Sequence, residues 1–203
     1  MINFTSGPKA VLSTCTTVGI HTVITAHKVV QLAKLEPLID ELTHNGIQVV
    51  YLEDLKSTLT LRDKVQGMMG ALFPRFVYQK TAGKVNPKDT AVILFTSGSE
   101  GFPKAVFLSH ENLLANCYQV YARFDLFRND VFLNCLPLFH SFGLGAGTLV
   151  PMMLGVKTFL YPTPLHYRII PEIAASIRAT VFFATDTFLS AYARCANPYD
   201  FNS

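Results

Sequence analysis

The chain has 203 residues, of which half are hydrophobic and 15% are charged, and its formal net charge is +3. A chain of this size can bury roughly 70% of its unfolded surface, so this composition indicates a folded interior or an apolar ligand tunnel rather than disorder. Lysine and arginine are scattered along the sequence without a basic stripe, which excludes nucleic acid as an expected partner.

The sequence also bears on compartment and metal content. Four cysteines lie far apart without a CxxC pair, as is typical of reduced cytosolic thiols. The start MINFTSGPK lacks the basic and apolar regions of a signal peptide. The most apolar stretch, Phe142–Val156, is shorter than the roughly 20 residues of a membrane span and is interrupted by glycine and proline. We therefore expect a soluble, cytoplasmic chain, and the spacing of its histidines predicts no metal site.

The first eighty residues alternate between helical and strand-like apolar patterns. In chain order the expected elements are a helix from Pro8 past Ser13, a strand at His21–Ala26, a helix at about Val29–Thr43 ended by Asn45-Gly46, and a strand at Ile47–Leu52.

A further apolar stripe at helical spacing follows, interrupted near its end by Pro74. We interpret its methionines as core residues. The polar segment Thr81–Asp89 contains glycine and proline and is the best internal linker and subdomain boundary. The residues of the stripe are Leu61, Val65, Met68, Leu72 and Phe76.

The remaining chain predicts strands that alternate with helices. Ser109 can cap a helix whose apolar face holds Leu113, Cys117, Tyr121 and Phe124. The alternation indicates an α/β fold with sheets flanked by helices. The expected strands are Ala91–Phe95, Ala105–Ser109, Val131–Leu136, Val156–Tyr161 and Thr180–Ala184, and the later helices are Ile170–Arg178 and Asp186–Ala196.

The segment TSGSEGFPK, from Thr96 to Lys104, has the residue types that bind polyphosphate. Glycines let successive backbone N–H groups turn toward an anion, hydroxyls add neutral donors, and lysine supplies a countercharge. The segment is not a Walker A loop, because Lys104 lies between Pro103 and Ala105 and a strand is expected after it. Composition alone leaves a flexible turn as the alternative.

The order of these residues, followed by SHENLLAN, resembles the phosphate loop of the adenylate-forming superfamily. The resemblance implies the N-terminal domain of such an enzyme, in which ATP, with Mg²⁺, reacts with a carboxylate to give an acyl-adenylate. It implies a catalytic role for Lys104 in stabilising charge on the leaving pyrophosphate. It also implies phosphate contacts from Thr96, Ser97, Gly98, Ser99, Gly101 and Lys104.

A second segment, LPLFHSFGL at Leu136–Leu144, resembles the aromatic motif of the same superfamily. The resemblance implies that His140 lies near the acyl carboxylate and the adenylate. It also implies that Phe139, Phe142 and Gly143 shape the acyl pocket. Without that context, a single histidine in an apolar run is more often a core residue.

Three further segments narrow the resemblance within the superfamily: the opening INFTSG, FLYPTPLHYRIIPE at Phe159–Glu172 and ATDTFLSAYARCANPYDF at Ala184–Phe201. They resemble acyl-acyl carrier protein synthetases that are joined to a 2-acylglycerophosphoethanolamine acyltransferase. This implies a long-chain fatty acid, acyl carrier protein and a lysophospholipid as partners, at the cytoplasmic face of a bacterial inner membrane. A fatty acyl-CoA synthetase and a non-catalytic nucleotide- or acyl-binding module are the alternatives.

Other parts of such an enzyme are not found in these 203 residues. The superfamily's acidic magnesium-binding motif, ribose-binding aspartate and C-terminal lysine are missing, and no histidine starts the HxxxxD pattern of the acyltransferase. We therefore expect residues 1–203 to be part of the AMP-binding domain. Since catalysis requires its groups in one geometry, we expect these residues alone to form no adenylate.

Overall fold

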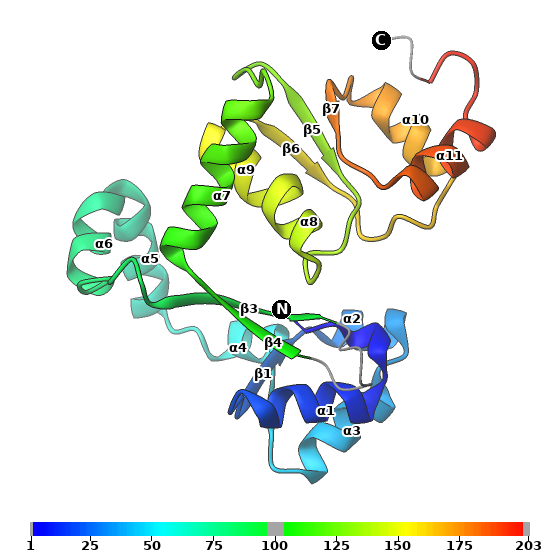
Figure 1. The fold of residues 1–203 in the computed structure, drawn as a ribbon. Coiled ribbons are helices and arrows are strands. Elements are labelled where there is room, and N and C mark those ends of the chain that lie inside the picture. Colours follow the sequence, from blue (N-terminus) through cyan, green and yellow to red (C-terminus); the bar gives the residue numbers. More distant parts are fainter. Residues whose placement is uncertain (1, 97–103, 201–203) are drawn as a thin grey trace. The chain divides into compact units, whose positions relative to one another are not determined.

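A computed structural model describes residues 2–96 and 104–200, with helices and strands alternating along the chain (Figure 1). The described residues form two compact units. The first holds residues 2–89, 95–96 and 104–106, and the second holds residues 90–94 and 107–200. Among the described residues, no helix is long and apolar enough to cross a membrane.

The first unit is built on two short parallel strands, in which Thr22 pairs with Gln48. Pro8 lies in the first turn of the first α-helix, where its missing N–H costs nothing. The elements are η1 (Phe4–Ser6), α1 (Pro8–Thr17), β1 (Thr22–Thr25), α2 (His27–Ala33), α3 (Glu36–His44), β2 (Gln48–Tyr51), α4 (Leu52–Thr58), α5 (Leu61–Leu72) and α6 (Pro74–Thr81). The buried core of this unit consists of Val11, Cys15, Leu38, Leu42 and Ile47.

The single helix expected at about Val29–Thr43 is wrong, because this segment forms two helices. Lys34 ends α2 with a left-handed backbone, at φ 52°. Pro37 then lies in the first turn of α3. In a continuous helix its ring would clash with the carbonyl of Ala33 and it could not donate the usual hydrogen bond, so the break is favoured at this point.

The interpretation of the methionines after Leu61 as core residues is also wrong. Met68 is 60% exposed and Met69 is 48% exposed, and neither α5 nor α6 contains a buried residue. The expected break at Pro74 is confirmed, since α5 ends at Leu72 and α6 begins at Pro74. The start of α5 is fixed by a capping box between Thr60 and Asp63.

Strands β3 (Thr90–Thr96) and β4 (Lys104–Ser109) pair with each other, and α7 (His110–Arg123) follows directly. The expected cap at Ser109 is confirmed: its hydroxyl accepts from the Asn112 backbone N–H at 3.2 Å, and the Asn112 side chain accepts from the Ser109 N–H at 3.1 Å. Of the apolar face expected on this helix, Cys117 is buried, whereas Tyr121 is half-exposed.

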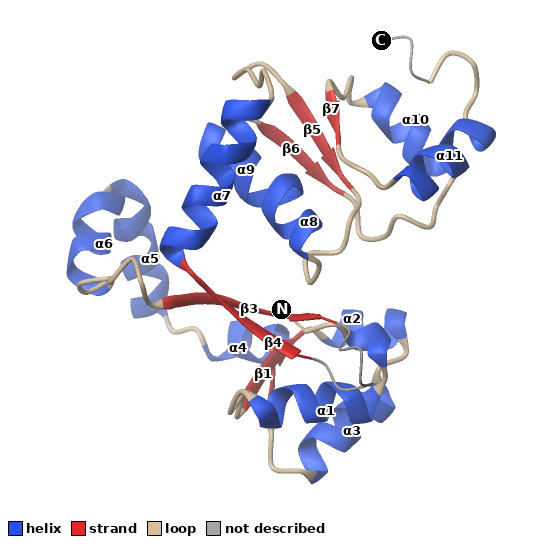
Figure 2. Cartoon of the chain, in the orientation of Figure 1, coloured by secondary structure: helices blue, strands red, loops and turns tan. Residues whose placement is uncertain are grey.

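The second unit contains a parallel sheet in the order β6-β5-β7 with helices on both faces (Figure 2). Phe132 of β5 packs with Cys117 and Val150, whereas the adjacent Leu133 packs with Ile170 and Tyr192 on the other face. The predicted α/β class is thus confirmed. The elements are β5 (Val131–Asn134), α8 (Ser141–Leu144), the π-helical turn η2 (Gly145–Leu149), α9 (Val150–Leu154), β6 (Lys157–Leu160), α10 (Ile169–Ser176), β7 (Val181–Phe182) and α11 (Asp186–Cys195).

The core of the first unit can be tested with one pair of leucine variants. Leu42 is 1% exposed in α3, whereas Leu32 is 76% exposed in α2. We expect Leu42→Ala to lower the free energy of unfolding by about 2–5 kcal/mol, because it leaves a cavity. Leu32→Ala should change it by less than about 0.5 kcal/mol. Urea unfolding followed by circular dichroism measures both, and equal losses would contradict the assigned core.

Candidate functional site

The expected phosphate loop lies between two paired strands. Thr96 is the last residue of β3 and Lys104 is the first residue of β4, and both are exposed. Ser97, Gly98, Ser99 and Gly101 lie outside the described residues. A strand follows Lys104, as predicted, which differs from the helix that follows a Walker A loop.

Lys104 carries a charge that is not neutralised within the described part of the chain. No carboxylate of residues 2–96 or 104–200 lies within ion-pair distance of its ammonium group. An exposed ammonium at one end of the loop and the Thr96 hydroxyl at the other are chemically suited to phosphate oxygens. These two described residues therefore fit a polyphosphate ligand such as ATP.

The second expected segment, Leu136–Leu144, follows β5 in the second unit and ends with α8. His140 is exposed and caps α8: its backbone N–H donates to the Pro137 carbonyl at 3.1 Å, and its carbonyl accepts from the Leu144 N–H at 2.9 Å. Its ring lies 4.8 Å from the Phe139 ring, measured between centroids. The backbone of the tight turn thus holds His140 while its imidazole remains accessible.

The other two aromatic-segment residues are placed by packing. The Phe142 ring lies 5.8 Å from the ring of Phe183, between centroids, and its side chain is 40% exposed. Gly143 is buried, and a Cβ atom at this position would overlap the carbonyl oxygens of Leu136 and Pro137. Only glycine therefore fits at position 143 without moving the backbone that precedes His140.

Sequence reasoning missed Asn134, which connects the strand to this segment. Its side chain is 1% exposed, and its amide NH₂ donates to the Gly143 carbonyl at 3.1 Å and to the Thr148 hydroxyl at 3.2 Å. Its carbonyl oxygen accepts from the Leu136 N–H at 3.0 Å. One buried amide thus ties β5, the beginning of the aromatic segment, α8 and η2 together. A polar residue within the apolar run VFLNCLPL was the available signal.

Glycine at position 147 makes room for this amide. The backbone of Gly147 lies so close to Asn134 that an added Cβ would overlap the side-chain amide atoms. Thr148, the next residue, also donates from its hydroxyl to the Gly143 carbonyl at 2.9 Å. The Gly143 carbonyl therefore accepts two hydrogen bonds, and the π-helical turn presents both the small residue and the hydroxyl.

A second polar contact lies on the other face of the β5 sheet, where the Tyr192 hydroxyl and the Cys135 thiol are surrounded by apolar side chains. The Tyr192 hydroxyl of α11 donates to the Pro164 carbonyl at 2.7 Å and lies 3.4 Å from the Cys135 sulfur. Burial raises the pKa of the Tyr192 hydroxyl and also that of the Cys135 thiol. Tyr192 therefore stays a neutral hydrogen-bond donor, which fixes the segment between β6 and α10 to the core.

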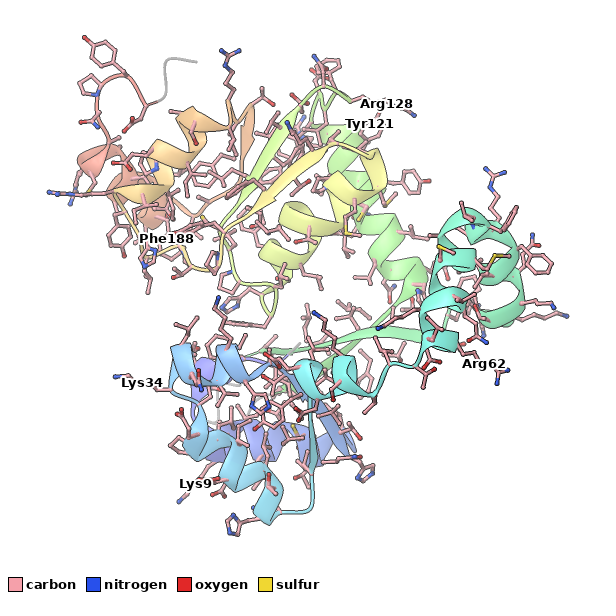
Figure 3. All side chains as sticks on the ribbon, turned by 180° about the vertical axis from the view of Figure 1, so that it is seen from behind. Lys9, Lys34, Arg62, Tyr121, Arg128 and Phe188 are labelled. Carbon is pink, nitrogen blue, oxygen red and sulfur yellow. The ribbon has the colours of Figure 1, made fainter. Side chains whose placement is uncertain are left out.

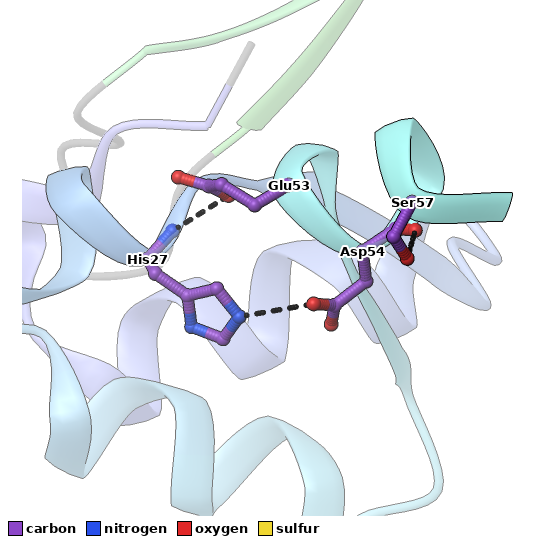
Figure 4. A network of polar contacts seen from close by, with 4 residues as sticks. All are labelled: His27, Glu53, Asp54 and Ser57. Carbon is purple, nitrogen blue, oxygen red and sulfur yellow. Dashed lines mark hydrogen bonds and ion pairs between the residues drawn. The ribbon is translucent and has the colours of Figure 1, made fainter. Parts of the chain in front are cut away.

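A third polar cluster, in the first unit, surrounds His27 (Figure 4). Its backbone N–H donates to the Glu53 carboxylate at 3.0 Å, its Nε2 lies 3.4 Å from Asp54, and its ring stacks on Tyr51 at 3.8 Å. Hydrogen bonds from backbone N–H groups, first that of Glu53 itself, lower the pKa of the Glu53 carboxyl. These contacts join α2 to α4. Within residues 2–96 and 104–200, no group of three or more metal-ligating side chains could hold an ion.

Comparison with known proteins identifies the class to which this arrangement belongs. The chain matches the AMP-binding enzyme family over residues 1–203, and it therefore belongs to this family of adenylate-forming enzymes. In structure it resembles the inhibitor-bound N-terminal domain of FACL13 from Mycobacterium tuberculosis, with a TM-score of 0.76 at 19% identity, over 100% of this chain and 46% of that one.

Two curated relatives are similar in sequence. The chain is 40% identical over 80 residues to the medium-chain fatty-acid–CoA ligase of Escherichia coli (strain K12), covering 39% of this chain and 14% of the relative. It is 28% identical over 139 residues to the medium-chain-fatty-acid–[acyl-carrier-protein] ligase TtuA of Teredinibacter turnerae, covering 58% of this chain and 22% of the relative. The chain thus spans less than a quarter of the length of either one.

The coupling between Asn134 and Gly147 can be measured. We expect Asn134→Ala to lower the free energy of unfolding by about 1–3 kcal/mol, because buried partners lose their hydrogen bonds. Gly147→Ala should cost about 1–3 kcal/mol by overpacking. In the double variant the clash is relieved, so the losses should fall short of additivity by about 1 kcal/mol or more.

Urea unfolding of the four proteins in this cycle provides the energies. Asn116→Ala serves as the control, because Asn116 is an exposed asparagine on α7 in the same unit, and its cost should stay within about 0.5 kcal/mol. Strict additivity of the two substitutions would contradict the contact between Asn134 and Gly147.

Proposed function

We propose that this chain supplies the ATP-binding part of a ligase that activates a long-chain fatty acid as an acyl-adenylate. The observation that carries the proposal is the position of TSGSEGFPK between paired strands, with exposed Thr96 and Lys104 at its two ends, in a chain that matches the AMP-binding family throughout. Two medium-chain fatty-acid ligases among its relatives support a fatty acid as the substrate. The longer chain length is proposed from the resemblance of the later segments. We also propose that a boundary between two subdomains of this ATP-binding part lies near residues 81–89.

The proposed reaction makes one bond and breaks one. A carboxylate oxygen of the fatty acid attacks the α-phosphorus of ATP, the bond to the β-phosphate oxygen breaks, and pyrophosphate leaves with the electron pair. Lys104 stabilises the negative charge that develops on pyrophosphate. Thr96 and, in the loop, Ser97, Gly98, Ser99 and Gly101 hold the phosphates. When bound, Mg²⁺ supplies further neutralisation of phosphate charge, and the residues that would ligate it are proposed to lie mostly outside this chain.

The aromatic segment has a separate role in the proposal. His140, held at the start of α8 with an accessible ring, donates a hydrogen bond toward the acyl carboxylate or the adenylate. Phe139 and Phe142 form an apolar wall, and Gly143 keeps the turn compact. Positioning of this kind raises the rate by bringing the two reactants together in one geometry.

For the second step we propose that the phosphopantetheine thiol of acyl carrier protein attacks the acyl-adenylate, so that a thioester forms and AMP leaves. A hydroxyl of lysophosphatidylethanolamine then takes the acyl group, and the thiol of the carrier protein is released. The two segments at Phe159–Glu172 and Ala184–Phe201 resemble the bifunctional Aas protein, in which both activities occur. The proposed location of such a protein is the cytoplasmic face of a bacterial inner membrane. A CoA ligase is the second candidate, favoured by the 40% identity to the CoA ligase of Escherichia coli.

The role of Lys104 can be tested by ATP–pyrophosphate exchange in the full-length protein. We expect exchange to require a long-chain fatty acid and to fall about 10²–10³-fold in Lys104→Ala, because one stabilising charge is lost from the transition state. Lys157→Ala is the matched control, since Lys157 is an exposed first residue of another strand. Unchanged exchange in Lys104→Ala would contradict the role of this lysine, and no exchange in the wild type would favour a non-catalytic module.

The acceptor can be identified in the same preparation. With radiolabelled fatty acid and ATP, we expect thioester to form on holo-acyl carrier protein and not on CoA. Apo-acyl carrier protein, which lacks the thiol, is the control. A thioester on CoA alone would contradict acyl carrier protein as the acceptor and would favour a CoA ligase. This test uses the wild-type protein, so its result does not depend on the role of Lys104.

A further inference from the structure

The aromatic segment is a loop with buried ends and an exposed tip. Residues 134–136 are buried, residues 137–139 are partly buried, and His140 is exposed. The chain returns to the interior at Gly143 and Leu144, which are both buried. His140 therefore lies at the outer end of a loop whose two ends are inside the second unit.

Both ends of this loop are held by one side chain. The Asn134 side-chain oxygen accepts from the Leu136 N–H at 3.0 Å, where the chain leaves β5, and its NH₂ group donates to the Gly143 carbonyl at 3.1 Å, where the chain returns. Asn134 is itself fixed in the sheet, because its backbone carbonyl accepts from the Tyr161 N–H at 2.8 Å. The distance between the two ends of the loop is thus set by one planar amide.

The imidazole of His140 depends on this backbone for its position. The N–H and the carbonyl of His140 are bonded to Pro137 and Leu144, which adjoin the two residues that Asn134 holds. Among the described residues, the ring of His140 contacts the Phe139 ring, and no side-chain hydrogen bond orients it. A shift of the loop ends would therefore be passed on to the imidazole.

We propose that Asn134 is a positioning residue of the adenylation reaction and that it holds the backbone that orients His140 toward the acyl carboxylate or the adenylate. The inference rests on the proposed function and adds to it a side chain that touches neither reactant. Asn134 is 1% exposed, and the hydrogen-bond partners of its side chain all lie in the described part of the second unit. A misplacement of about 1 Å in a reacting group can lower a rate by about 10²-fold, so the loss of such a support is measurable.

The kinetics of ATP–pyrophosphate exchange in the full-length protein test the proposal. We expect Asn134→Ala to lower kcat/KM for the fatty acid about 10–10²-fold, because His140 is displaced. In the His140→Ala background the same substitution should lower it less than about threefold, because no imidazole is left to position. Two independent effects would instead multiply, and that result would overturn the proposal. So would an unchanged kcat/KM in Asn134→Ala.

A milder variant, Thr148→Val, tests the same point if Asn134→Ala does not fold. It removes the hydroxyl that accepts from the Asn134 amide at 3.2 Å and donates to the Gly143 carbonyl at 2.9 Å. We expect kcat/KM to fall in this variant only while His140 is present. A fall of equal size in the His140→Ala background would overturn the proposal.

The matched control is Tyr192→Phe, which removes another buried hydrogen bond of the same unit. The Tyr192 hydroxyl donates to the Pro164 carbonyl at 2.7 Å, and the ring of Phe188, labelled in Figure 3, lies 6.3 Å from the Tyr192 ring between centroids. Because these contacts lie on the other face of β5, kcat/KM should change less than about twofold. An equal loss in this control would overturn the proposal, since a general loss of stability would then explain both results.

Hydrogen–deuterium exchange with mass spectrometry provides a readout that needs no turnover. We expect Asn134→Ala to speed deuterium uptake about tenfold or more in the peptide that contains the His140 and Leu144 amides, because the loop is released. Peptides from α10 and α11 should take up deuterium as in the wild type. Equal acceleration throughout the second unit would overturn the proposal, because it would assign Asn134 to stability alone.

The same experiments separate this inference from the proposed function. A wild-type protein without fatty-acid-dependent pyrophosphate exchange would overturn both of them. An active wild type in which the effects of Asn134→Ala and His140→Ala multiply would overturn the positioning role of Asn134 and leave the proposed adenylation intact.

Discussion

The buried amide of Asn134 is the interaction on which the aromatic segment depends. A polar side chain inside an apolar layer is tolerated only when its hydrogen bonds are made, and all of its partners here belong to the chain that leaves β5 and turns through α8. The amide therefore fixes the path of this segment in a way that apolar packing alone would not. Gly143 and Gly147 complete the arrangement. Gly143 has no side chain where its backbone approaches the carbonyls of residues 136 and 137, and Gly147 has none where its backbone approaches the Asn134 amide.

The parallel sheet of the second unit supplies the frame for that turn. Strand β5 is central, so Phe132 and Leu133 are buried on opposite faces by different helices. A strand that is covered on both sides cannot shift by one residue without exchanging its two faces. The position of Asn134 at the end of β5 is consequently set by the two residues before it. The position of His140 is set in turn, because only a short connection separates β5 from α8.

Local signals in the sequence predicted much of the fold. Ser109 followed by Asn112 marks a helix start through contacts within four residues, and Pro74 breaks a helix by its own covalent structure. The order of residues around Lys104 and His140 predicted the family, and the strands on either side of the loop were found as expected. The exposure of Met68 could not be predicted from such local signals. Helical spacing shows which residues share one side of a helix, but it does not show whether another part of the protein covers that side. Asn134 was missed because the two acceptors of its amide NH₂, at Gly143 and Thr148, are nine and fourteen residues away.

The contact between Cys135 and Tyr192 has a consequence for synthesis on the ribosome. The two residues are 57 positions apart, and the face of β5 that holds Leu133 is covered by residues 170–192. At about 5–20 residues per second, this face waits roughly 3–12 s for its cover after β5 has been made. During that interval the apolar face of this strand has no cover from the chain's own later residues.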